Sequence, residues 1–150
     1  ARATICWSGT IAHNGILGVG REEDWSTHGL EHELSALYDV THGAGLAVMF
    51  PAYMKYTIDC DLERYRQLAV RVFDVKDQPD NPKAVALEGI ARLEAFYKEI
   101  KMPLTFAEIG AKKEDIDKLL EKLDINRSFP MGNFKKLTRE DARNIYLLAC

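Results

Sequence analysis

The sequence predicts an all-α fold, on the basis of its apolar spacing, its helix caps and the absence of strand-like segments. Apolar residues recur at steps of three and four in four segments from residue 61 onward, a spacing that places one stripe on a helix. No segment alternates apolar and polar residues clearly enough to predict a strand, and no repeat or low-complexity linker interrupts the pattern. With 150 residues, 47% of them hydrophobic, the chain has the size of one domain with a substantial core.

The first 57 residues divide into three expected segments. A mostly apolar helix opens the chain from Ala1 to Leu17 and ends at a glycine-rich turn. Two further segments are separated near Asp39 to Thr41, and Thr41 is a suitable N-cap for the second. The apolar run from Gly43 to Met54 has about 12 residues, whereas a membrane-spanning helix needs about 20. It therefore predicts a buried helix.

Four helices with apolar stripes are expected from residue 61 onward. Asn81 followed by Pro82 is a cap and first-turn pair, and Thr138 with Asp141 three residues later caps the last helix. Loops rich in Pro, Asp, Asn and Gly are expected at residues 74–80 and 126–136. The stripes are Leu62, Tyr65, Leu68, Ala69, Val72 and Phe73; Ala86, Ile90, Leu93 and Tyr97; Ile116, Leu119, Leu120 and Leu123; and Ala142, Ile145, Tyr146 and Ala149.

Composition and charge exclude several classes of function. The 20 Lys and Arg against 23 Asp and Glu give a net charge of −3, and no third of the chain carries the dense positive charge that nucleic acid requires. No segment is long and apolar enough to span a membrane. Cys6, Cys60 and Cys150 are too scattered for a disulfide framework or a zinc cluster, so we expect a reducing, cytoplasmic setting.

All four histidines lie between residues 13 and 42. On a helix, His28 and His32 would project from one face and could both reach a single ion or substrate. His42 follows fourteen positions after His28, beyond the expected break. Imidazole is the usual protein ligand for zinc and a common one for iron. The spacing alone leaves two interpretations open, a metal or catalytic site and a pair of packing or capping histidines, and it assigns His13 no role.

His28 to His32 also match the H-x-x-E-H pattern of the inverzincin metallopeptidases. In such a peptidase the two histidines would bind zinc and Glu31 would be the general base that activates water. The pattern is short enough to occur by chance, and no further carboxylate ligand is identified. A zinc peptidase is therefore an alternative function, and a helical module without catalysis is another.

Five aromatic residues among the first 57 could line a substrate pocket or belong to the core. Aromatic side chains are more often buried in the core than placed in a pocket wall, so the core is the expected location. The residues are Trp7, Trp25, Phe50, Tyr53 and Tyr56.

The segments Cys6–Ala12, Asn14–Arg21, Asp24–Asp39 and His42–Ala47 resemble the iron-containing (group III) alcohol dehydrogenases. Within that family they are most similar to the NADPH-dependent butanol dehydrogenases. The resemblance implies that residues 1–150 are the larger, later part of a dehydroquinate synthase-like helical domain, without the N-terminal α/β domain that binds the dinucleotide. It also implies hydride transfer between NAD(P)H and small primary alcohols or aldehydes, and family members often form homodimers.

The resemblance also implies roles for three histidines. His28 and His42 match the last two of the three histidines that, with an aspartate, bind one divalent ion, iron or zinc. The other two ligands lie upstream of Ala1 in family members. His32 matches a histidine near the nicotinamide and substrate that does not bind the metal, which implies a catalytic role as a proton relay. NADP or NAD would bind mainly to the absent domain, so we expect the isolated chain to bind metal weakly or not at all and to be inactive.

Overall fold

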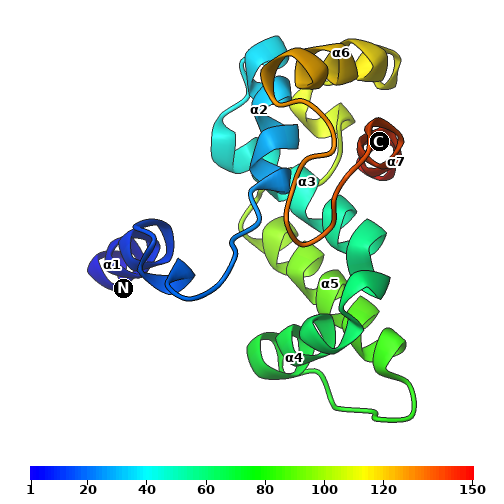
Figure 1. Cartoon of the computed structure of the whole chain (residues 1–150). Helices are drawn as coiled ribbons and strands as arrows, with labels where there is room; N and C mark the ends of the chain where they lie inside the picture. The colour runs from blue at the N-terminus through cyan, green and yellow to red at the C-terminus, as the bar shows by residue number, and fades with distance from the viewer.

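The computed structural model describes all 150 residues and confirms the all-α fold (Figure 1). β-structure is limited to one isolated bridge between Met131 and Leu137, and no helix is long and apolar enough to cross a membrane. Short 3-10 turns connect several of the helices. The α-helices are α1 (Arg2–His13), α2 (Ser26–Tyr38), α3 (His42–Thr57), α4 (Leu62–Phe73), α5 (Pro82–Glu99), α6 (Ile116–Asn126) and α7 (Arg139–Leu148).

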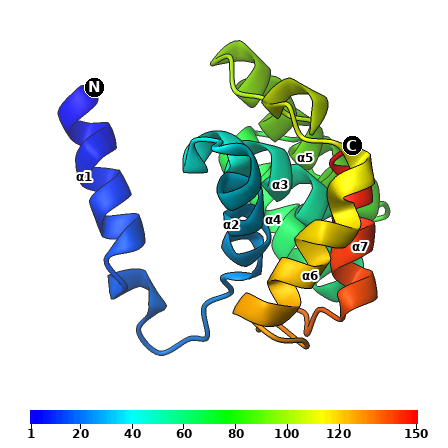
Figure 2. The ribbon, with the colours of Figure 1, turned by 90° about the horizontal axis from the view of Figure 1, so that it is seen from above.

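Helix α1 stands apart from the other helices, as the views in Figures 1 and 2 both show. The helix expected over residues 1–17 ends at His13 and is followed by a 3-10 turn, Ile16–Gly18. Gly15 precedes that turn with a φ of 82°, a left-handed conformation that favours glycine. No residue of α1 is buried, and Trp7 is 66% exposed. The expected core position of Trp7 is therefore wrong, because no other helix of this chain lies along α1.

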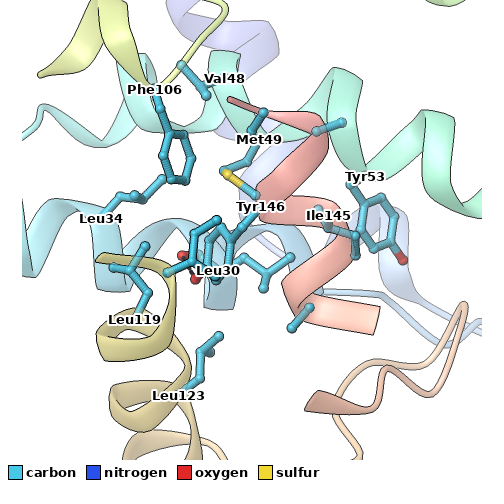
Figure 3. Packing of buried hydrophobic residues seen from close by; sticks show 14 of the residues in the cluster. Leu30, Leu34, Val48, Met49, Tyr53, Phe106, Leu119, Leu123, Ile145 and Tyr146 are labelled. Atoms are coloured by element: carbon cyan, nitrogen blue, oxygen red, sulfur yellow. Dashed lines mark hydrogen bonds between the residues drawn. The ribbon is translucent and has the colours of Figure 1, made fainter. Parts of the chain in front are cut away.

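The main core forms where α2, α3, α6 and α7 meet (Figure 3). Leu30 and Leu34 of α2 and Met49 of α3 are fully buried there, together with Tyr146 of α7. The Tyr146 hydroxyl donates a hydrogen bond to the main-chain oxygen of Leu30 at 2.8 Å, so the buried hydroxyl is satisfied. Phe106 closes this core from the connection between α5 and α6, a segment that the sequence analysis left unassigned.

Helices α4 and α5 pack on the far end of α3 around a smaller apolar cluster that includes Met54, Tyr65 and Ile90. Gly89 of α5 lies directly against Ala69 of α4. A Cβ at residue 89 would overlap the Ala69 side chain and lie 2.8 Å from its Cα. Only a glycine therefore permits this close approach of the two helices.

Two of the three predicted caps are confirmed in full, whereas Thr41 occupies the N-cap position of α3 without a capping hydrogen bond from its side chain. The Asn81 side chain accepts a hydrogen bond from the Ala84 amide at 3.3 Å and starts α5. Thr138 and Asp141 form a reciprocal capping box at the start of α7. Asp141 also accepts a hydrogen bond from the Tyr56 hydroxyl of α3. Burial by itself would raise the pKa of Asp141, but the hydrogen bonds from Tyr56 and Thr138 outweigh it and lower this pKa to about 2.

Asp141→Asn is expected to lower the free energy of unfolding of the full-length protein by about 1–2 kcal/mol at neutral pH, the usual cost of a lost cap and its hydrogen bonds. The folded-state pKa of about 2 lies below the ordinary 3.8, so the carboxylate stabilises the fold above about pH 4. This stabilisation is lost as the pH falls toward 2. Unfolding curves of wild type and variant should therefore differ at pH 7 and converge in acid.

Asp80→Asn is the matched control, because Asp80 is an exposed loop residue next to a helix start and its carboxylate makes no hydrogen bond. A stability loss for Asp80→Asn equal to that for Asp141→Asn would show that lost charge, and not the cap, accounts for the effect.

Candidate metal centre

The turn between α2 and α3 places three histidines side by side. Asp39 ends α2 in a left-handed conformation, with a φ of 54°, and its amide donates to the main-chain oxygen of Ser35. The chain then turns within three residues, and α3 begins at His42 with Thr41 as its N-cap residue. His28 and His32 lie one turn apart on α2, on the face opposite to Leu30 and Leu34, because the apolar face of α2 is buried in the core.

The imidazole rings of these histidines converge. Each of His28, His32 and His42 offers a ring nitrogen within 4.8 Å of those of the other two. The closest pair is His28 Nδ1 and His42 Nε2, at 3.1 Å. Two nitrogens bound to one zinc ion at about 2.0–2.1 Å lie roughly 3.0–3.4 Å from each other. The His28–His42 pair therefore has the spacing of two ligands of a single divalent ion.

The surroundings of His28 favour its neutral form. Burial lowers its pKa, and so do the neighbouring imidazoles of His42, His32 and His13, while Glu31 acts in the opposite direction. Metal binding requires the deprotonated imidazole. A lowered pKa keeps His28 neutral at a more acidic pH than the ordinary histidine value of 6.5.

Glu31, in the middle of the H-x-x-E-H segment, is directed away from the solvent. Its side chain is fully buried, and its carboxylate accepts hydrogen bonds from His42 Nδ1 and from the Ser35 hydroxyl. A general base for peptide hydrolysis must reach a water molecule in the active site. Because Glu31 is enclosed and both of its oxygens are engaged, the structure argues against the peptidase alternative.

His32 is held by Arg127, which follows α6 in the chain. Arg127 Nη2 lies 2.6 Å from His32 Nδ1. Because a guanidinium is always protonated, it must be the donor, and Nδ1 of His32 must be the acceptor. The proton of the neutral His32 imidazole is therefore on Nε2. No local sequence pattern indicates Arg127 as a partner of His32, since 95 residues separate the two.

Aromatic rings line one side of the histidine cluster. The Trp25 ring lies 4.8 Å from the His28 ring, and the Phe50 ring of α3 lies 6.2 Å from it. Trp25 is 45% exposed, so its expected core position is wrong, whereas Tyr53 is buried in the core as expected. Trp25 and Phe50 instead form part of the wall of the site, the alternative that the sequence had left open.

His13 also reaches this wall. Its ring lies 5.4 Å from the ring of Trp25 and 6.2 Å from that of His28. The sequence assigned His13 no role, and the signal that could have found it is the confinement of every histidine to one short stretch. All four histidines of the chain thus lie around one point, although His13 is not among the three whose nitrogens converge.

Asp24 holds the loop that contains Asn133 and Phe134 against the start of α2. Its carboxylate accepts hydrogen bonds from the Ser26 amide, the Tyr53 hydroxyl and the Phe134 amide. Burial would raise the pKa of Asp24, but these hydrogen bonds outweigh it and lower this pKa, so the carboxylate is charged at neutral pH. A cavity of about 250 Å³ remains between this loop and α2, with Trp25 and Arg127 in its wall. Neither histidine lines this cavity, but Trp25 lies beside the His28 ring and Arg127 contacts His32.

The sequence as a whole matches one family. The profile described as "Fe-containing alcohol dehydrogenase family, C-terminal" matches residues 1–150. The chain belongs to the iron-containing alcohol dehydrogenase family. This membership confirms the family that the motif resemblance indicated, and it agrees with the all-α fold of the C-terminal part of such proteins.

Curated relatives of this chain include two bacterial proteins. The probable NADH-dependent butanol dehydrogenase 1 of Bacillus subtilis is 42% identical over 144 residues, which are 96% of this chain and 37% of the relative. The NADPH-dependent aldehyde reductase YqhD of Escherichia coli is 31% identical over 145 residues, which are 97% of this chain and 37% of the relative. The Bacillus relative is named for NADH, whereas the resemblance had suggested the NADPH-dependent group.

A solved structure shows the same fold. The crystal structure of NADH-dependent butanol dehydrogenase A from Thermotoga maritima aligns with a TM-score of 0.91 at 36% identity, over 99% of this chain and 38% of that one. The chain therefore spans a little over a third of the length of the relatives that it matches.

Proposed function

We propose that this chain is the metal-binding part of an alcohol dehydrogenase that interconverts primary alcohols, such as butanol, and aldehydes with NADH or NADPH. The observation that carries the proposal is the convergence of His28, His32 and His42 in a member of a family described as iron-containing. The printed names of its relatives, butanol dehydrogenases and an aldehyde reductase, indicate the substrate class.

His28 and His42 would hold the divalent ion, iron or zinc, because their facing nitrogens have ligand spacing. The remaining ligands would come from residues outside this chain, and a dinucleotide would bind mainly outside it as well. When bound, the ion supplies Lewis acidity that favours hydride transfer at the alcohol or aldehyde carbon.

His32 would exchange the hydroxyl proton of the substrate. Its Nε2 carries the proton while Arg127 holds Nδ1, so the ring presents a donor toward an aldehyde that is being reduced. For the proton transfer itself the Arg127 contact would open. A ring protonated on both nitrogens would give its Nε2 proton to the alkoxide formed from the aldehyde, and the neutral ring left behind would accept the alcohol proton on Nε2 in the oxidation direction. His32 lies one helical turn from His28, so it can exchange a proton with the substrate while His28 serves as the metal ligand.

Trp25 and Phe50 would limit the access of water to the reacting group. Their rings flank His28, and a dry site strengthens the interaction of fixed charges with a developing alkoxide. The small cavity beside Trp25 and Arg127 would take part of a small, uncharged alcohol. The three cysteines are exposed and unpaired, in keeping with a proposed reducing, cytoplasmic setting.

The test is the consumption of reduced nicotinamide with butanal by the full-length protein. The protein is stripped of metal with a chelator, reloaded with ferrous or zinc ion, and assayed with NADH and with NADPH. We expect turnover only after reloading. A full-length protein that is inactive with every combination of metal, cofactor and aldehyde would contradict the proposed function.

A further inference from the structure

The further inference concerns Glu31, whose buried carboxylate has a single imidazole partner. Glu31 has no exposed surface, and an isolated carboxylate would be very costly to bury in this way. It accepts hydrogen bonds from His42 Nδ1 across the α2–α3 junction and from Ser35 one turn along α2. The Glu31 carboxylate therefore contacts the Nδ1 side of the His42 ring, whereas the Nε2 side of the ring faces His28.

We propose that Glu31 is a positioning residue for the metal centre, which fixes the orientation and tautomer of His42. A hydrogen bond from Nδ1–H to a carboxylate leaves the lone pair on Nε2, and Nε2 is the atom that lies 3.1 Å from His28 Nδ1. The negative charge of such a partner also makes the imidazole a better ligand. Glu31 thus directs and strengthens His42 without touching metal or substrate, and this role rests on the proposed function.

Gly45 is part of the same arrangement, because it leaves the space that the Glu31 side chain occupies. A Cβ at residue 45 would overlap Glu31 Oε1 and lie 2.7 Å from its Cγ and 2.8 Å from its Cδ. These atoms belong to a side chain fixed at both oxygens, so relief of the overlap requires that Glu31 move away from His42. Gly43, two residues earlier in α3, has open space at the equivalent position.

The experiment compares Glu31→Gln, Glu31→Ala and Gly45→Ala in the full-length protein, with Gly43→Ala as the matched control. The dissociation constant for zinc is measured by competition with a chelating dye. Loss of a hydrogen-bonding partner behind a metal-binding histidine typically weakens metal binding by 10- to 100-fold, so we expect about that loss for Glu31→Ala and Gly45→Ala. Glu31→Gln keeps the shape and an acceptor without the charge, and should lose about 10-fold. Gly43→Ala should bind zinc as wild type does.

The double variant Glu31→Ala/Gly45→Ala separates positioning from damage to the fold. If Gly45→Ala acts only by displacing Glu31, it should cost nothing further once Glu31 is truncated. Nitrogen NMR of isotope-labelled histidines in the metal-free protein provides a readout that is independent of activity. His42 should carry its proton on Nδ1 in wild type, and this preference should be lost in Glu31→Ala.

Unchanged zinc affinity in Glu31→Ala, or a His42 proton on Nε2 in wild type, would overturn the role of Glu31 and leave the proposed function intact. A wild-type protein that binds neither zinc nor iron would instead overturn the proposed function, and this inference with it. Additive losses in the double variant would show that Gly45 acts by another route and would overturn its part of the proposal.

Discussion

Substitution of His28 by alanine in the full-length protein is expected to abolish stoichiometric metal binding and, with it, the proposed alcohol dehydrogenase activity. His28 Nδ1 lies 3.1 Å from His42 Nε2, so its removal takes one of the two facing nitrogens from the centre. Loss of a partner behind a ligand already costs 10- to 100-fold in affinity, so loss of a ligand should weaken metal binding by at least about 100-fold. Bound metal, measured by atomic emission after dialysis, and turnover of butanal should fall together.

His13→Ala is the matched control for this prediction. The His13 ring lies beside that of His28, yet His13 is not among the converging ligand atoms. The substitution His13→Ala removes an imidazole from the same wall of the site. The metal content of this variant should remain that of wild type. Full metal content in His28→Ala would refute the ligand assignment, and loss of metal in His13→Ala would show that the fourth histidine is also needed.

His32→Gln is expected to retain the metal and lose most of the turnover. Glutamine can still accept the hydrogen bond from Arg127, but it cannot exchange a proton at neutral pH. A positioned general acid or base contributes about 10²- to 10⁴-fold to a rate, so kcat should fall within this range. The change should appear in kcat and in its pH dependence, while zinc affinity remains close to that of wild type.

The metal measurement decides between two roles for His32. Its ring nitrogen lies within 4.8 Å of those of His28 and His42, so a parallel loss of metal and turnover would make it a third ligand and not a proton relay.

Arg127→Met provides a milder test of the role of His32. It removes the donor to His32 Nδ1 and should lower kcat less than His32→Gln does, with the metal content unchanged.

The sequence by itself determined the helical fold and indicated the histidines of the candidate centre. Periodic apolar stripes and caps act over one to three turns, so the starts of α5 at Asn81 and of α7 at Thr138 could be predicted from neighbouring residues alone. The same local geometry places His28 and His32 on one face of α2. The motif resemblance added the role of His42, which stays a prediction, and the family, which the match over residues 1–150 confirms.

Only the tertiary structure decided what surrounds those histidines. Glu31 reaches His42 because a turn brings α3 beside α2, and Arg127 reaches His32 because the end of α6 packs near α2. Trp7 and Trp25 are exposed although they are apolar, since burial depends on which other elements cover a side chain. The two hydrogen bonds join residues that are 11 and 95 positions apart in the sequence. Local sequence patterns do not specify partners at such separations, and they do not specify which element covers a side chain. The hydrogen-bond partners and the exposure of these residues therefore follow from the tertiary fold.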